Sequence, residues 1–311
     1  MQGLSSPSDT ATGVGNNMLI PVDFSEMSNL AVKFGFEIAQ RLDLTPVILY
    51  ASPIPLPIMY NAYPEDMGGL DNESVQVEEM EVGVEIYHNA EHRMKFFKKQ
   101  LAEWQDNGQL LKIPFKTVVE EGMPEEVIRD YCKFNNPDVL VMATRGIRKK
   151  EEELVGSVTA EVLDNCRTPL FAIPEDYSLC SVKSIVRLVA ICQLEGHDVA
   201  CVRKLMQMFG NPSVNIWLVP LAEKLDVARQ KVELDNILVQ LKEEFPDSIF
   251  ESVELGSDNR RKELEDFLAT NDIQMIIVPN KKKNFFARLF NPGIAHRILF
   301  EKDIPLLALP V

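Results

Sequence analysis

One glycine-bearing loop occurs twice in this chain, and only the first copy has the residues of a phosphate site. The two copies span residues 142–163 and 278–299, and they align without a gap. Glycine lets backbone N–H groups approach an anion closely, whereas proline removes a donor. The pattern therefore predicts two related units, of which one binds an anion. The aligned pairs that differ are Gly146 with Lys282, Gly156 with Pro292, and Ser157 with Gly293.

Several features of the first copy favour a phosphate. Gly146 permits a positive φ and a close backbone approach. Gly156 and Ser157 open an expected helix, whose N–H groups and dipole attract an anion and whose serine hydroxyl is a further donor. Arg145 and the basic run 148–150 add positive charge to an acidic chain. A Gly-Ser pair at a helix start is also an ordinary cap, so the spacing alone leaves both interpretations open.

The other motifs in the sequence give weaker evidence for a functional site. His88, Glu91 and His92 match H-x-x-E-H, whose spacing places two histidines on one helix face as a zinc site requires. The segment belongs to a long charged helix without an evident third ligand, so we interpret it as a solvated surface and predict no metal ligands. The chain contains neither G-x-S-x-G nor G-x4-G-K-[ST], so nothing supports catalysis beyond a slow nucleotide turnover.

Composition narrows the class of protein. A chain of 311 residues suits two domains, and its formal net charge of −15 argues against nucleic acids and anionic membranes as partners. A local nest of N–H groups still accepts one small anion. Five cysteines without a C-x-x-C pair indicate reduced thiols, and no apolar run approaches the ~20 residues that span a bilayer. We therefore expect a cytoplasmic protein.

Hydrophobic periodicity predicts a disordered tail at 1–17, a first domain at 18–176 and a second domain at 184–311. Buried strands alternate with amphipathic helices, which is typical of doubly wound α/β domains, here with a five-stranded parallel sheet in each. Residues 52–80 predict a long loop or lid. The expected strands are 18–22, 46–50, 115–119, 139–143, 170–173, 185–192, 214–220, 250–255, 275–278 and 306–309. The expected helices are 30–39, 82–107, 124–134, 157–166, 200–209, 225–245 and 261–269.

The strand assignment locates the site. In a doubly wound sheet, ligands bind beyond the carboxyl ends of the strands, where the strand order reverses. The first strand of the first domain ends at Pro21-Val22-Asp23, and the fourth strand ends at Ala143. We therefore expect these residues to face the same space as Gly146.

The first domain resembles the universal stress protein family, in its two-domain tandem form. The segment Pro21-Val-Asp-Phe-Ser25 is similar to the first-strand signature of that family, and Glu121-Gly-Met-Pro124 is similar to its G-x-P segment. ATP-binding members carry G-x2-G-x9-G-[ST], which residues 143–157 match except for Ala143 at the first glycine. The resemblance covers residues 18–174 strongly and 184–311 weakly. It implies a fold like that of the adenine nucleotide alpha hydrolases.

The resemblance also implies an adenine nucleotide site that takes ATP, with Mg²⁺ as its companion ion. Asp23 would hold the adenine together with the backbone near Pro21 and Ala51. Val22 belongs to the same turn, and Gly122 would lie near the ribose. The residues implied at the phosphates are Ala143, Gly146, Gly156, Ser157 and Val158. Arg145 is a further candidate there because of its positive charge.

The second domain departs from this pattern at each matching point. Cys192 stands roughly at the position of Asp23, Pro279 replaces Ala143, and Pro292 lacks a backbone donor. We therefore expect a structural, regulatory or dimerisation role for this domain. The final strands 170–173 and 306–309 are expected to join the two domains about a pseudo-twofold axis, as in relatives, and whole chains could further form a homodimer.

Three functions follow as hypotheses. The leading one is a non-enzymatic, ATP-binding regulator of the stress response that signals to a protein partner not identified by the sequence. The alternative is a nucleotide-free interaction protein whose ligand is a protein or an apolar molecule, which the Met- and aromatic-bearing loop 54–67 favours. A slow ATPase ranks last, because the sequence places no general base at the site.

Overall fold

The computed structural model describes residues 16–52, 72–144, 157–174, 177, 185–220, 227–255, 260–280 and 304–311. Residues 1–15 of the expected tail and 53–71 of the expected loop lie outside these ranges. Asn17, assigned to the tail by the sequence, is the first residue of a strand. The carboxylate of Asp138 accepts hydrogen bonds from the N–H groups of Asn16 (2.8 Å) and Asn17 (3.2 Å), which fixes the start of that strand.

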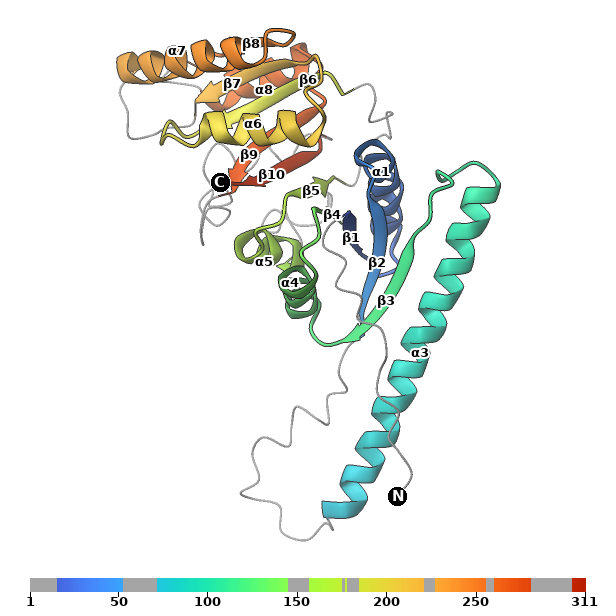
Figure 1. Cartoon of the computed structure of the whole chain (residues 1–311). Coiled ribbons are helices and arrows are strands. Elements are labelled where there is room, and N and C mark those ends of the chain that lie inside the picture. The colour runs from blue at the N-terminus through green and yellow to red at the C-terminus, as the bar shows by residue number, and fades with distance from the viewer. Residues whose placement is uncertain are drawn as a thin grey trace.

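One ten-stranded sheet runs through both halves of the chain (Figure 1). The strand order is β3-β2-β1-β4-β5-β10-β9-β6-β7-β8, so the second half repeats the order of the first in reverse. The first half contributes β1 (Asn17–Pro21), β2 (Thr45–Ser52), β3 (Lys116–Glu121), β4 (Val139–Ala143) and β5 (Leu170–Ile173). The second contributes β6 (Arg187–Cys192), β7 (Asn215–Pro220), β8 (Ile249–Ser252), β9 (Met275–Asn280) and β10 (Leu306–Pro310).

The two halves meet at their last strands. β5 and β10 pair antiparallel, with Phe171 opposite Leu307. The other neighbouring strands of the sheet pair parallel. The sequence predicted that these two strands would join the halves, and the structure confirms it. The junction turns two parallel five-stranded arrays into one continuous sheet.

Helices cover both faces of the sheet, which is why the strands read as continuous apolar runs. In the first half, α1 and α3 lie on one face, and α4 and α5 lie on the other (Figure 1). Phe34 and Phe171 are fully buried on the first of these faces. The helices are α1 (Glu26–Leu42), α3 (Asn72–Asp106), α4 (Pro124–Asn135), α5 (Ser157–Asn165), α6 (Asp198–Met208), α7 (Val227–Glu244) and α8 (Arg260–Thr270).

Helix α3 begins at Asn72, within the segment that the sequence predicted as a loop. Its later part packs on the sheet through Ala90, Met94, Phe97 and Leu101, at helical spacings of three and four. Its first part extends beyond the sheet (Figure 1). Because this part lies away from the core, core periodicity did not mark its start, and the prediction of a loop over 72–80 was wrong.

Candidate functional site

The carboxyl ends of β1 to β4 meet at one edge of the sheet. The Val22 N–H donates to the Leu49 carbonyl at 2.8 Å, and the Gly122 N–H donates to the Ser52 carbonyl at 2.9 Å. Thr144, directly after β4, donates its N–H to the Ile173 carbonyl at 2.8 Å. These bonds place the predicted residues Pro21, Val22, Asp23, Ala51, Gly122 and Ala143 along this edge. The predicted residues Arg145, Gly146 and Gly156 lie outside the described residues.

Asp23 forms a tight turn after β1. Its Oδ1 accepts a hydrogen bond from the Ser25 N–H at 2.9 Å, while its side chain stays exposed. Burial acts to raise the pKa of Asp23, but hydrogen bonds from Ser25 and Ser28 outweigh it and hold the pKa below its usual range. Ser25 also caps α1 by accepting from the Ser28 N–H at 3.2 Å. The edge therefore presents an ionised carboxylate, which only accepts hydrogen bonds.

Phe24 holds the Asp23 turn in an uncommon conformation. Its φ of 63° lies in the left-handed region, which is strained for a bulky residue. The ring compensates by packing 4.5 Å from Tyr50 and 5.3 Å from Phe97, centroid to centroid. The Arg93 guanidinium lies 4.7 Å from the Phe24 centroid and donates to the Tyr50 hydroxyl at 3.1 Å. The sequence did not predict this cluster, because it joins residues of three separate elements.

Gly122 makes the turn from β3 into α4. Its φ is 147°, a conformation that favours glycine, and an added Cβ would lie 2.8 Å from Cγ2 of Val127. Pro124 then starts α4 at a position where its missing N–H costs nothing. The G-x-P pattern of the sequence thus has a steric reason. Glycine and proline allow a sharp turn between β3 and α4, at the place where the resemblance implies a ribose.

Substitution of Gly122 by alanine is expected to destabilise the chain by about 2–4 kcal/mol, through backbone strain and the clash with Val127. The matched control is Gly108→Ala. Gly108 also has a positive φ, 79°, but no atom lies within 4 Å of an added Cβ. The control should therefore lose only about 1 kcal/mol. Urea denaturation of both variants measures the difference, and equal losses would contradict the steric account.

On the β4 side, the first turn of α5 is tied to the strand end. The Thr159 hydroxyl donates to the Ala143 carbonyl at 3.2 Å, and the Thr144 hydroxyl donates to the Ile173 carbonyl at 3.3 Å. Both threonines are buried. Ser157 is the first residue of α5, and the Val158 side chain is half-buried. The N-terminus of a nine-residue helix is thereby fixed next to β4.

The second half carries glutamine at the position of Asp23. Met18 pairs with Val139 in the first half, and Leu188 pairs with Met275 in the second. This register matches Val22 to Cys192 and Asp23 to Gln193, so the prediction that Cys192 stands roughly at the Asp23 position was off by one residue. The backbone supports the correction, because Leu194 has a φ of 56°, close to that of Phe24. A neutral amide therefore replaces the carboxylate.

The described residues do not support a metal site at the H-x-x-E-H motif or at the cysteines. His88 Nδ1 and Glu91 Oε2 are 3.7 Å apart on an exposed face of α3. In the described part of the chain, no three His, Cys, Asp or Glu side chains are grouped to hold a metal ion. Nor does any described helix combine the length and apolar character needed to cross a membrane. The cysteines described are buried free thiols, namely Cys132, Cys166, Cys192 and Cys201.

The fold is that of an α/β protein with a mostly parallel sheet, a class in which ligands generally bind beyond the carboxyl ends of the strands. Comparison with known proteins specifies the class. The model of the universal stress protein family matches residues 16–174, and the chain belongs to that family.

Two relatives match half of the chain, and a solved structure matches nearly all of it. Universal stress protein MJ0531 of Methanocaldococcus jannaschii is 26% identical over 156 residues, which are 50% of this chain and 80% of that protein. Universal stress protein MJ0577 of the same organism is 27% identical over 158 residues, which are 50% of this chain and 93% of that protein. A universal stress protein from Archaeoglobus fulgidus covers 95% of this chain and 98% of its own, with a TM-score of 0.62 and 14% identity. That likeness shows the fold.

Proposed function

We propose that this universal stress protein is a non-catalytic sensor that binds one ATP, with Mg²⁺, at the carboxyl ends of β1 to β4. The observation that carries the proposal is the ionised Asp23 carboxylate, held by Ser25 beside the backbone of Val22 and near the end of β2. Adenine offers an exocyclic amine, which is a donor that a carboxylate accepts. Gln193 at the matching position limits the proposal to one site per chain.

The phosphates would lie against the N-terminus of α5. Ser157 and Val158 contribute backbone N–H groups there, and the helix dipole favours negative charge. The sequence adds Gly146, Gly156 and Arg145 between β4 and α5. Mg²⁺, when bound, neutralises phosphate charge and is held chiefly by phosphate oxygens and water. The chain's own part is to present donors to the remaining oxygens.

A sensing role fits the electrostatics of Asp23 better than hydrolysis does. The pKa of Asp23 is below its usual range, so its carboxylate is a weak base near neutral pH. A sensor also needs a surface that a protein partner reads. We place that surface on α3, which extends beyond the sheet (Figure 1) and exposes 72% of Phe96. Buried free thiols fit the reducing cytoplasm.

Exposed aromatic side chains support the second candidate, a nucleotide-free interaction protein. Phe134 on α4 is also 73% exposed, and large exposed aromatic side chains are enriched at protein interfaces. The loop 54–67, which favoured this candidate in the sequence, lies outside the described residues. This candidate predicts partner binding that nucleotide does not change.

Isothermal titration calorimetry of the full chain tests the proposal. ATP with Mg²⁺ should bind, and tripolyphosphate with Mg²⁺ should bind more weakly, because it lacks the base that Asp23 holds. Phosphate release should stay at the rate of the buffer control. The absence of heat and of any thermal stabilisation at millimolar ATP would refute the proposal and leave the interaction protein.

A further inference from the structure

A buried side chain of the second half donates hydrogen bonds to a helix of the first half. Asn280 ends β9 and is only 8% exposed. Its side-chain amide donates to the Leu163 carbonyl at 3.0 Å and to the Cys166 carbonyl at 3.5 Å. Leu163 lies in the last turn of α5, and Cys166 follows the helix end. One residue of the second half therefore caps the C-terminus of α5.

This cap satisfies groups that the helix itself cannot satisfy. The last carbonyls of a helix have no intrahelical donor, and burial makes an unpaired carbonyl costly. Leu163 is 1% exposed, so water does not readily replace Asn280 there. The contact also lies beside the β5–β10 pairing, which joins the two halves. The end of α5 is thus held in place by the second half.

Comparison of the two halves shows which residue of the first half corresponds to Asn280. Ala143 pairs with Ile173 in the first half, and Pro279 pairs with Leu309 in the second. Asn280 is therefore the counterpart of Thr144, the residue that leads into the phosphate loop. In the second half, this position no longer leads into a phosphate site with the first half's glycines. Its side chain instead donates hydrogen bonds to carbonyls at the end of α5.

We propose that the second half positions the phosphate side of the nucleotide site through Asn280, an inference that rests on the proposed function. Helix α5 has nine residues. At 1.5 Å per residue it is about 13 Å long, short enough to move as one rigid piece. Thr159 ties its first turn to Ala143, and Asn280 ties its last turn to β9. Loss of the second tie lets the helix shift and moves the N–H groups at Ser157.

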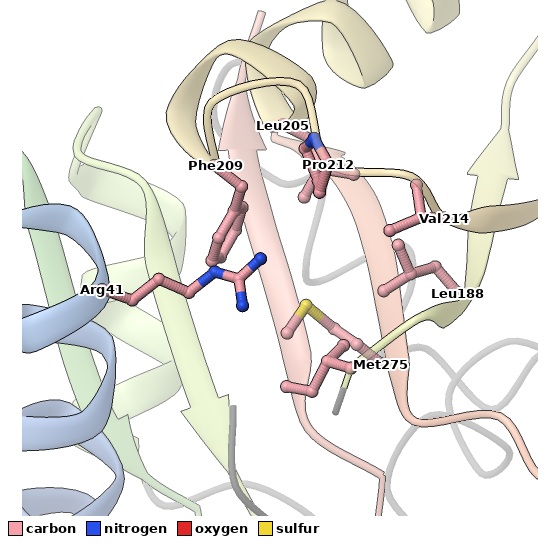
Figure 2. Close-up of a pocket in the computed structure, with 8 residues that line it drawn as sticks. Arg41, Leu188, Leu205, Phe209, Pro212, Val214 and Met275 are labelled. Atoms are coloured by element: carbon pink, nitrogen blue, oxygen red, sulfur yellow. The ribbon is translucent and has the colours of Figure 1, made fainter. Parts of the chain in front are cut away.

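The test combines two variants with a control at the same junction. Asn280→Ala removes the amide, and Asn280→Thr installs the residue type of the matching position, whose hydroxyl is too short to reach α5. The control is Arg41→Gln. Arg41 comes from α1 and lies over the Phe209 ring at 5.3 Å on the other face of the junction, where it borders a small apolar pocket (Figure 2).

The expected result has two parts. Amide hydrogen exchange in residues 160–166 should become about three- to tenfold faster in both Asn280 variants, the loss of one net hydrogen bond, while exchange in α1 and β6 stays unchanged. The affinity for ATP with Mg²⁺ should fall by a similar factor of about three to ten. Arg41→Gln should leave both the exchange of α5 and the ATP affinity as in the unchanged chain.

The exchange measurement separates this inference from the proposed function. If the unchanged chain binds no ATP, the proposed function fails, and faster exchange confined to α5 still supports Asn280 as the residue that holds the helix. Unchanged exchange in α5 would overturn the inference. It would also be overturned by faster exchange with unaltered ATP affinity, or by exchange that rises equally throughout the chain.

Discussion

Asp23→Ala is expected to weaken ATP binding by about tenfold to more than a hundredfold, because a hydrogen bond to a charged group contributes about 1.5–3 kcal/mol. The second half has the neutral amide of Gln193 in place of this charged acceptor. Calorimetric titration of the full chain measures the change. Binding of tripolyphosphate should not change, because that ligand has no base for Asp23 to hold.

The repeat supplies a matched control for this variant. Gln193 occupies the counterpart position in the same local conformation, after β6 instead of β1. Gln193→Ala should leave ATP affinity unchanged. Asp23→Asn keeps an oxygen that accepts from the Ser25 N–H, so it separates the charge from the turn. Equal losses in Asp23→Ala and Gln193→Ala would contradict a single site in the first half.

Phe171→Ala is expected to lower the free energy of unfolding by about 3–5 kcal/mol, the range for removing a fully buried phenylalanine. Phe171 is 0% exposed on β5, at the junction of the halves. Its ring lies 5.4 Å from that of Phe34 on α1 and 6.5 Å from that of Phe209 at the end of α6. The substitution therefore opens a cavity shared by both halves.

Urea denaturation followed by far-UV circular dichroism measures this loss. The control is Phe134→Ala on α4, whose side chain is 73% exposed and contacts Lys133. Its effect should stay within about 0.5 kcal/mol. A decrease in the free energy of unfolding of less than about 1 kcal/mol for Phe171→Ala would show that the junction is not part of the common core, because removal of a buried phenylalanine ring usually destabilises a protein by more.

The central strands were predictable, because burial on both faces of the sheet gives them continuous apolar runs. β4 was expected at 139–143 and spans Val139–Ala143. The start of α3 was not predictable by the same signal, because its first part extends away from the sheet (Figure 1). A periodic apolar stripe reports packing, so it does not mark a helix segment without a core.

The site was predictable in part for a similar reason. The place of Asp23 at this edge follows from the end of the first strand, whereas Ala51 and Gly122 were implied by the family resemblance. The contacts of Arg93 with Phe24 and of Asn280 with α5 join distant segments, and no local pattern records them. The confusion of Cys192 with the Asp23 position arose from aligning two halves of unequal length without the strand register.

The two halves carry different residues at matching positions of one sheet. The first keeps an ionised carboxylate, a glycine turn and a helix N-terminus at one edge. The second has Gln193 in place of the carboxylate and directs Asn280 to the first half's helix. This division explains why a duplicated fold is expected to bind its ligand only once.

The stoichiometry of ATP binding tests this account most directly. Equilibrium dialysis of the full chain against labelled ATP with Mg²⁺, taken to saturation, counts the ligand bound per chain. We expect one ATP per chain, with saturation shifted to about tenfold to more than a hundredfold higher ATP in Asp23→Ala and unshifted in Gln193→Ala. Two bound ATP molecules, or none, would contradict it.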